Sequence, residues 1–386
     1  MAERIKIFFL KYKLFLASAI AFLSTLIVYI LTLEPKLVGG DTSWFAIQVP
    51  RMEVLAPTGY PSFSIFGKLA TFIPVKDLAY RLNLLSAIFG ALTVLFLFLA
   101  INKLVKNEII ALAGSLSFGF TLSFWKIANR FELDTINCFY ISLTLFAAFL
   151  YNEKKNRKYL YFAFFCLGLS LTDHPISLFV MPALLLYIII IKPQIFKRPK
   201  AALLSILFFI LPLSLYAFIP IRSVQGYGPV KNLKDFFYYI TGRYTTGTIH
   251  GGSFGDKDFA NFLKVSKEFF IIVYQNFGFA LIIIGIVGLI YLFKKNIKFA
   301  ACSLVLIASN LIIITQYIGW APQNQVLSSS IIVAVYTTYG FLFIFDAFKF
   351  LLSRFDNQKF KKSGIADGSE RQTGLGIGKK EKYTKR

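Results

Sequence analysis

Long apolar stretches alternate with polar connections along almost the whole chain. A helix needs roughly 20 apolar residues to cross the hydrocarbon core of a bilayer, and ten stretches approach that length. They comprise residues 14–33, 78–101, 108–125, 134–151, 159–172, 175–192, 201–221, 267–293, 297–318 and 327–350. The pattern predicts an all-α polytopic membrane protein with about ten transmembrane helices, the fifth of them short.

Two connections, residues 34–77 and 222–266, are much longer than most of the others and fall on the same side of the predicted bundle. The first contains GYPSFSIFGKLATFIP, an apolar segment that is too short to span a bilayer, so we expect an interfacial or re-entrant helix there. The second contains LKDFFYYITGRY, whose aromatic and basic residues favour a helix on the membrane surface. Because long loops carry function more often than short ones, we expect function on this side.

The composition excludes an ordinary soluble protein. Of 386 residues, 56% are hydrophobic and only 16% are charged, whereas soluble domains are usually about 25% charged. Three cysteines, far apart in apolar runs, and two histidines give no support to a disulfide framework or a zinc site. No nucleotide-binding loop or hydrolase motif is present, so ATP-driven transport and hydrolysis have no positive support.

The net charge of +23 is distributed unevenly between the two sides of the predicted bundle. When charges at span ends are counted with the nearer side, the side of both termini holds 28 Lys/Arg and 8 Asp/Glu, and the other holds 14 and 11. Positive charge favours the cytoplasmic side, so we expect both termini inside the cell and the two long connections outside. A tail that binds nucleic acid is the alternative; the distribution instead favours topology and contact with anionic lipids.

We therefore expect one transmembrane domain, residues 1–352, followed by a basic cytoplasmic tail, residues 353–386. The tail is polar and rich in glycine, as disordered segments are.

Ionisable residues gather at the span ends on the predicted outer side. Such groups are costly at membrane depth and mark function by default, so their clustering predicts a polar cavity at the outer surface. The candidates are Asp41, Arg81, Arg130, Glu132, Asp134, Asp173, His174, Arg222 and Arg243.

The acidic candidates have structural alternatives. Asp41 follows Gly39-Gly40 and could cap a helix that begins at Thr42. Glu132 and Asp134 could pair with Arg130 or Lys126.

The remaining candidates have them too. Asp173-His174-Pro175 could be a tight turn before the sixth span. Arg222 could reach lipid phosphates, as basic residues at span ends do, and Arg81 could pair with a nearby acid.

Several segments in series resemble the domain-of-unknown-function 2723 family, which is similar to protein O-mannosyltransferases within the C-type membrane glycosyltransferases. The segments are GGDTSWF, APTGYPSFSIFGKLATFIP, AYRLNLLSAIFGALTVLFLF, WKIANRFELDTINCFYISLTLF, GLSLTDHPISLFVMPALLL and PLSLYAFIPIRS followed by FFYYITGRY. They cover roughly residues 20–250 in order, with a weaker echo to 350. Two departures are visible: Trp44 stands where the family pattern has an acid, and Ala56-Pro57-Thr58 stands where it has His-Pro-Pro.

The resemblance implies a fold of ten to twelve spans and a catalytic carboxylate early in the first outer loop, at the position of Asp41. It also implies an inverting transfer of a sugar, with mannose the first candidate, from a polyprenyl-phosphate-linked donor to a hydroxyl of a protein or glycan. We expect a multi-pass protein of the bacterial cytoplasmic membrane, with the reaction on its outer side. The lipid-linked sugar is the only cofactor-like partner expected, nucleic acid is not a partner, and the need for a divalent metal is left open.

The chemistry of this transfer calls for the same residue types. A base must accept the proton of the acceptor hydroxyl, and a cation must stabilise the leaving phosphate, for which the planar fork of arginine is well suited. We assign Asp41 as the base and Arg222 as the first candidate for the donor phosphate. Further phosphate candidates are Arg81, Arg130 and Arg243, and the sugar or acceptor candidates are Glu132, Asp134, Asp173, His174 and Tyr60.

Two other functions fit the sequence less well. A lipid or polysaccharide transporter without enzymatic activity should carry polar residues in mid-span positions and on both sides. A degenerate partner subunit is suggested by the departures at Trp44 and Ala56.

Overall fold

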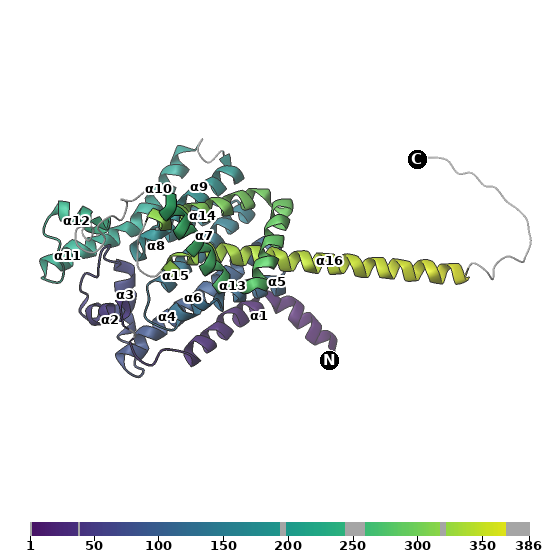
Figure 1. Ribbon diagram of the computed structural model, residues 1–386, viewed down its shortest axis with the longest axis horizontal. Coiled ribbons are helices and arrows are strands. Elements are labelled where there is room, and N and C mark those ends of the chain that lie inside the picture. Colours follow the sequence, from purple (N-terminus) through teal and green to yellow (C-terminus); the bar gives the residue numbers. More distant parts are fainter. Residues whose placement is uncertain (1, 38, 194–197, 244–258, 317–321, 368–386) are drawn as a thin grey trace, which may run out of the picture. The chain divides into compact units, whose positions relative to one another are not determined.

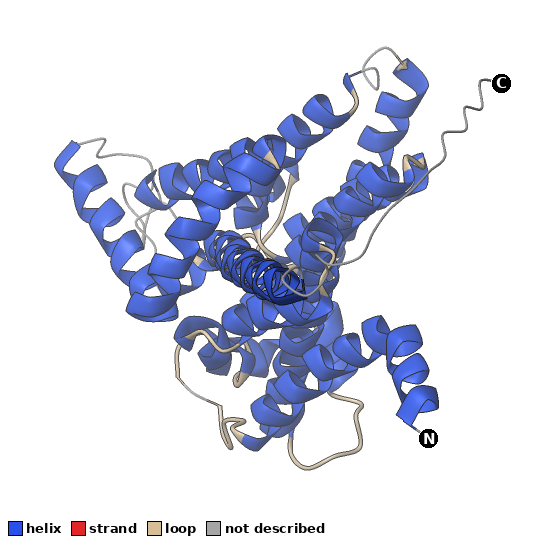
Figure 2. Cartoon of the chain, turned by 90° about the vertical axis from the view of Figure 1, so that its right-hand side faces the viewer, coloured by secondary structure: helices blue, strands red, loops and turns tan. Residues whose placement is uncertain are grey.

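The computed structural model describes residues 2–37, 39–193, 198–243, 259–316 and 322–367. Within these ranges the chain forms helices and connecting turns, with no strand (Figure 2). It divides into two compact units, residues 1–341 and 342–386. All the candidate site residues belong to the first unit.

The helices, with short 3₁₀ helices labelled η, follow one another along the chain as in Figure 1. They are α1 (Ala2–Leu31), α2 (Asp41–Gln48), η1 (Val49–Arg51), α3 (Pro61–Ala70), α4 (Leu78–Val105), α5 (Glu108–Gly119), α6 (Leu122–Ala128), α7 (Asp134–Lys154), α8 (Arg157–Asp173), η2 (Pro175–Phe179), α9 (Val180–Ile191), α10 (Pro199–Leu213), η4 (Ser214–Ala217), α11 (Phe218–Val224), α12 (Leu233–Ile240), α13 (Phe259–Lys295), α14 (Ile297–Gln316), α15 (Pro322–Gln325) and α16 (Leu327–Asp367).

The prediction of an all-α polytopic membrane protein is confirmed. Seven helical segments of the described chain are long and apolar enough to cross a membrane, and an eighth is added if α5 and α6, which meet at a bend of 72°, form one span. The other two expected stretches, 159–172 and 175–192, fall on α8 and on the shorter apolar helix Pro175–Ile191. Each apolar stretch recognised in the sequence is therefore mostly helical over its described residues, although not all are long enough to span a bilayer straight.

Helix α4 is the centre of the packing in the first part of the chain. It packs against α1, α5, α6 and α7, while α7 packs against α8 and α8 against α10. The contact between α8 and α10 is very close, since a Cβ placed on Gly168 would lie 2.2 Å from the carbonyl oxygen of Phe209. This packing brings the start of α4, the end of α6 and the start of α7 together, where the acidic candidates lie.

The first long connection, residues 34–77, contains α2, η1 and α3, so the expected helix in it is confirmed. A cluster of buried apolar side chains fixes these helices to α4 and to the turn before α7. The ring of Phe63 on α3 stacks on Phe131 of that turn, with 4.5 Å between ring centroids, and contacts Phe45 of α2 edge to face. The connection is thus part of the folded core.

The second long connection begins inside a helix, because α11 continues to Val224. The expected helix is present as α12. Helix α13 begins at Phe259 and its candidate span at Phe262, both earlier than the expected residue 267. Residues 244–258 lie outside the described residues. Helix α13 is broken at Gly278, whose backbone angles of φ 67° and ψ 173° are essentially restricted to glycine.

The tail differs from the prediction. Helix α16 continues to Asp367, so residues 353–367 are helical where the composition suggested disorder. The physical reason is local: no glycine or proline interrupts the sequence from Ser353 until Gly364, and both residues are the strongest helix breakers. Residues 368–386 lie outside the described residues.

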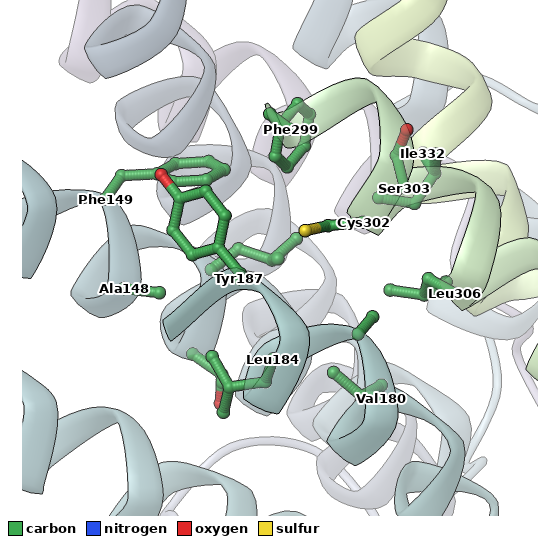
Figure 3. A pocket seen from close by; sticks show the side chains of 13 residues that line it. Ala148, Phe149, Val180, Leu184, Tyr187, Phe299, Cys302, Ser303, Leu306 and Ile332 are labelled. Atoms are coloured by element: carbon green, nitrogen blue, oxygen red, sulfur yellow. The ribbon is translucent and has the colours of Figure 1, made fainter. Parts of the chain in front are cut away.

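An apolar cavity between α7, α9 and α14 has a volume of about 20 Å³. Figure 3 shows the rings of Phe149, Tyr187 and Phe299 and the thiol of Cys302 around it. A single water needs about 10–15 Å³ of such volume, so this cavity is too small for a substrate.

Candidate functional site

Asp41 is the first residue of α2 and is exposed. Gly40 is the N-cap residue, with a φ of 81° that glycine adopts at no steric cost. The expected alternative, in which Asp41 itself caps a helix beginning at Thr42, does not describe this turn. An acid in the first turn is favoured by the helix dipole, and its position leaves the carboxylate at the protein surface.

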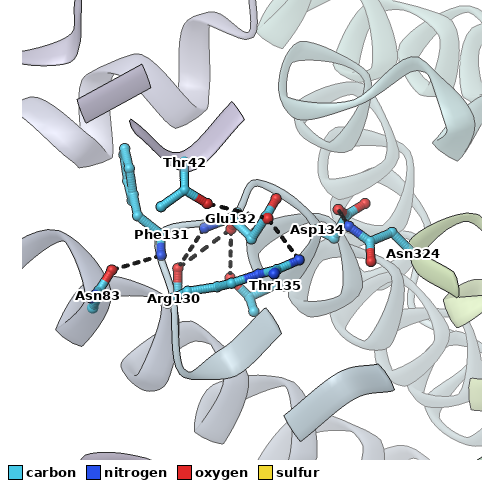
Figure 4. A network of polar contacts seen from close by, with 9 residues as sticks. Thr42, Asn83, Arg130, Phe131, Glu132, Asp134, Thr135 and Asn324 are labelled. Atoms are coloured by element: carbon cyan, nitrogen blue, oxygen red, sulfur yellow. Dashed lines mark hydrogen bonds and ion pairs between the residues drawn. The ribbon is translucent and has the colours of Figure 1, made fainter. Parts of the chain in front are cut away.

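The turn between α6 and α7 places a buried carboxylate next to α2. Glu132 forms an ion pair with Arg130, at 3.0 Å between Nη2 and Oε1, and the hydroxyl of Thr42 donates a hydrogen bond to the same Oε1 at 3.3 Å. Figure 4 shows these three side chains meeting at one point. The pairing of Glu132 with Arg130 that the sequence suggested is thus present, and it also ties the start of α2 to this turn.

Asp134, the first residue of α7, lies on the other side of the same turn. It is buried, and Nδ2 of Asn324 on α15 donates a hydrogen bond to its Oδ2 at 2.7 Å (Figure 4). The two carboxylates of the turn therefore have different partners, a guanidinium for Glu132 and an amide for Asp134.

Two polar residues of α4 hold the turn in place. Asn83 is fully buried; its Oδ1 accepts the N–H of Phe131 at 2.8 Å and its Nδ2 donates to the carbonyl of Glu34 at 2.9 Å. Ser86 accepts the N–H of Glu132 at 3.2 Å. Because these bonds satisfy backbone groups that would otherwise be buried without partners, the turn is held rigidly.

A polar cavity of about 180 Å³ lies beside the carboxylates, between α6, α13 and α15. Its polar lining includes two cations, Lys126 and Arg130, and a set of side-chain amides. The residues that line it are Leu122, Ser123, Lys126, Ile127, Arg130, Gln275, Asn276, Gln323 and Asn324.

Two buried donors at this cavity have no hydrogen-bond partner among the described residues: Nε of Arg130 and Nδ2 of Asn276. The Oδ1 of Asn276 is already used, since it accepts the N–H of Ser123 at 3.0 Å. A buried donor without a partner costs about 1–3 kcal/mol. The cavity thus presents positive charge and unsatisfied donors, which suits an anionic ligand.

The electrostatics of Glu132 are unusual for a carboxylate. Burial, followed by the neighbouring charge of Asp134, raises its pKa to about 7, and the charge of Asp41 adds to the effect. The ion pair with Arg130 and the hydrogen bond from Thr42 act in the opposite direction. The carboxylates of Asp41, Glu132 and Asp134 therefore lie near one another and form an acidic group.

Asp173, His174 and Tyr60 gather in a neighbouring place. The Tyr60 ring, at the start of α3, stacks on the His174 ring with 6.0 Å between centroids and 12° between planes. Burial lowers the pKa of His174 to about 4, and its Nδ1 accepts the N–H of Ile176, so the neutral ring carries its proton on Nε2. Asp173 is fully buried at the end of α8. His174 caps η2, as the structural alternative for this turn expected.

Two of the arginines assigned to the donor phosphate are engaged by the chain itself. Arg81 donates to the carbonyls of Thr71, Val75 and Lys76 at 2.8–3.0 Å. Each of the three nitrogens of Arg222 donates a hydrogen bond within the two long connections.

Of the other two arginines in that set, Arg130 lines the polar cavity beside the carboxylates. Arg243 is exposed just after α12.

The chain is similar to known proteins in sequence and in fold. Residues 41–196 match the family model described as the protein O-mannosyl-transferase TMEM260 N-terminal domain. The resemblance to protein O-mannosyltransferases is confirmed. The matched residues include Asp41, Arg130, Glu132, Asp134, Asp173 and His174.

Two curated relatives match over a longer part of the chain. It is 25% identical over 321 residues to protein O-mannosyl-transferase tmem260 of Dictyostelium discoideum, and 28% identical over 241 residues to TMEM260 of Mus musculus. The matches cover 76% and 58% of this chain but only 39% and 33% of the relatives. The chain thus spans between a third and two fifths of the length of these curated relatives.

Solved structures establish the fold. ArnT from Cupriavidus metallidurans bound to undecaprenyl phosphate is similar with a TM-score of 0.58 and 13% identity, over 84% of this chain and 59% of that chain. The apo oligosaccharyltransferase of Archaeoglobus fulgidus is similar with a TM-score of 0.55 and 14% identity, over 90% and 52%. The protein has the fold of the C-type membrane glycosyltransferases.

Several residues of the site were not singled out in the sequence. Asn83 and Ser86 lie three residues apart in an apolar span. This spacing places both on one helix face and indicates a polar contact there. The amides at 275–276 and 323–324 carried no such signal, because their segments are far apart in sequence and meet only in the fold.

The raised pKa of Glu132 predicts that the free energy of unfolding falls as the pH rises from about 5 to about 8. The unfolded chain ionises this group near its ordinary value of 4.5, while the native protein holds the proton until about 7, so proton loss favours unfolding in this window. Thermal unfolding in detergent across this range should show the decline, and Glu132→Gln should make it shallower.

Glu34→Gln, which changes an exposed acid of the first long connection, serves as the control and should leave the profile unchanged. If Glu132→Gln and the wild type gave parallel profiles, the buried acid would not be the group that titrates.

Proposed function

We propose that the protein is an inverting membrane glycosyltransferase. In this proposal it transfers a sugar, with mannose the first candidate from the names of the relatives, from a polyprenyl-phosphate-linked donor to a hydroxyl of a protein or glycan. The observation that carries the proposal is the juxtaposition of a cation- and donor-lined cavity with the acidic group formed by Asp41, Glu132 and Asp134. Such a transfer needs an anion site for the leaving phosphate and a base for the acceptor.

The donor phosphate is assigned to the cavity between α6, α13 and α15. Lys126 and Arg130 supply two positive charges, and the unsatisfied Nε of Arg130 and Nδ2 of Asn276 supply hydrogen bonds. Charge-assisted hydrogen bonds to phosphate are the strong ones. Arg130 thereby takes the role for which Arg222 was the first candidate, and a structural neighbour that was solved with undecaprenyl phosphate is consistent with this ligand class.

Asp41 is assigned as the general base. It is the exposed member of the acidic group, whereas Glu132 and Asp134 are buried and bonded to Arg130 and Asn324. In the transfer the acceptor oxygen attacks the anomeric carbon and its proton passes to Asp41. The bond between that carbon and the phosphate oxygen breaks, and the phosphate leaves with the electron pair and the new negative charge.

The remaining candidates are assigned to the sugar or the acceptor. Glu132 and Asp134 flank the cavity, and the neutral His174 offers its Nε2–H beside the Tyr60 ring. Asp173 lies next to His174 along the chain.

The proposed reaction takes place outside the cytoplasm, with both termini inside. Ile47→Cys places an exposed thiol on α2, where 61% of the surface of Ile47 is accessible, and the three native cysteines are buried. A membrane-impermeant maleimide should therefore label this variant in intact cells. Labelling only after the membrane is permeabilised would show that α2 lies on the cytoplasmic side.

Asp41→Asn should lower the rate of transfer by about 10²- to 10⁴-fold, because an amide cannot accept the proton of the acceptor. The measurement is transfer of labelled sugar from a membrane lipid extract at matched expression, with Asp134→Asn in parallel. Asp77→Asn is the matched control, since Asp77 caps α4 through its side chain and asparagine caps equally well. Full activity of Asp41→Asn would exclude Asp41 as the base. Loss of activity in Asp134→Asn alone would assign that role to Asp134.

Lys126→Ala should weaken binding of undecaprenyl phosphate by about tenfold to a hundredfold, the effect of losing one hydrogen bond to a charged group. Arg130→Ala should do so as well, and Arg130→Lys less. Binding is measured with the purified protein in nanodiscs, which makes the result independent of the sugar. Lys231 is an exposed cation of the second long connection, and Lys231→Ala is the control. Equal affinity of all four variants and the wild type would show that the phosphate does not bind in this cavity.

A further inference from the structure

The two long connections are joined by a set of contacts that we call the clasp, formed by Arg222, Tyr227 and Tyr239 against residues 51–55. Arg222 donates from Nη2 to the carbonyl of Arg51 at 2.6 Å and from Nε to the carbonyl of Met52 at 2.7 Å. Its guanidinium also lies 4.2 Å from the centre of the Tyr227 ring. One side chain thus binds two consecutive carbonyls and an aromatic face.

Backbone and apolar contacts extend the clasp. The N–H of Val54 donates to the carbonyl of Tyr227 at 2.7 Å, and the hydroxyl of Tyr239 donates to the carbonyl of Leu55. Val54, Ile219 and Tyr239 belong to one buried apolar cluster. The clasp is therefore a packed interface between segments that are about 170 residues apart.

The clasp holds a turn that is strained on its own. Met52, whose carbonyl accepts from Arg222, has a φ of 54°, in the left-handed region that residues other than glycine, asparagine and aspartate rarely adopt. Such a conformation is strained and persists only where the surroundings fix it. Arg222 supplies charge-assisted bonds at this turn.

The turn ends the helical segment that carries Asp41. Helix α2 begins at Asp41 and continues directly into η1, which ends at Arg51. The start of this segment is tied to Glu132 through Thr42, and its end is tied to Arg222 and, through the carbonyl of Pro50, to Lys68 on α3 at 2.6 Å. A short rigid segment held at both ends transmits a shift at one end to the other.

We propose that Arg222 is a positioning residue for Asp41. Arg222 fixes the far end of the α2–η1 segment and thereby sets the position of the Asp41 carboxylate. This inference rests on the proposed function. Lysine cannot replace Arg222, because a single ammonium group lacks the planar fork that binds both carbonyls and stacks on Tyr227. A displacement of about 1 Å in a reacting group can lower a rate by about 10²-fold.

The experiment combines kinetics with two cysteine reporters. Val54→Cys reports on the clasp and Ala46→Cys on α2, since both native side chains are buried, as are the three native cysteines. In nanodiscs, Arg222→Lys should speed maleimide labelling at both positions, lower kcat for sugar transfer by about tenfold to a hundredfold, and leave the affinity for undecaprenyl phosphate unchanged. Tyr227→Phe keeps the stacked ring and should match the wild type in all three measurements.

Three results would overturn the inference. Weaker binding of undecaprenyl phosphate in Arg222→Lys, with both reporters still protected, would make Arg222 a phosphate ligand. Faster labelling at position 54 alone would show that the clasp does not control α2. Unchanged labelling and unchanged kcat would make Arg222 an ordinary surface contact. A wild type that transfers sugar from no donor would count against the proposed function, while the two labelling rates would still decide whether the clasp positions α2.

Discussion

Backbone groups outside regular helices need hydrogen-bond partners, and where they are packed against other elements the protein itself must supply them. This constraint accounts for much of the site. The connections that carry the acidic residues are not continuous helices, and their carbonyls are bonded by side chains from other elements. Asn83 binds the carbonyl of Glu34, Arg81 binds three carbonyls after α3, and Arg222 binds two after α2. The rigid placement of Asp41 and Glu132 follows from these bonds.

The same constraint explains which parts of the site could be predicted from the sequence. The apolar stretches predicted the helices, because the length and hydrophobicity of a stretch are enough to recognise one. The two glycines before Asp41 indicated a turn with a carboxylate near the start of a helix. The clustering of Arg130, Glu132 and Asp134 followed from their proximity in the chain. The roles of the arginines did not, because a guanidinium that binds carbonyls and one that binds phosphate have the same sequence signature.

The cavity was beyond prediction for a different reason. Its lining comes from α6, α13 and α15, which are separated by long apolar segments. One adjacent pair of amides in the expected span 267–293 and another just before the last span do not show that the two pairs meet. The bend of 72° between α5 and α6 also could not be foreseen, since the stretch 108–125 reads as one span. Only the packing of these helices shows that Asn324 meets Asp134 and that Asn276 meets Ser123.

The break at Gly278 separates two tasks that a single continuous helix could not perform together. The part of α13 that follows it, residues 279–295, is apolar and belongs to a segment suited to lie among lipid chains, whereas Gln275 and Asn276, just before it, form part of the polar wall. In a straight helix the direction of the wall would be dictated by the tilt of the segment in the bilayer. The break at Gly278 gives the wall a direction of its own, different from that of the apolar part that follows it.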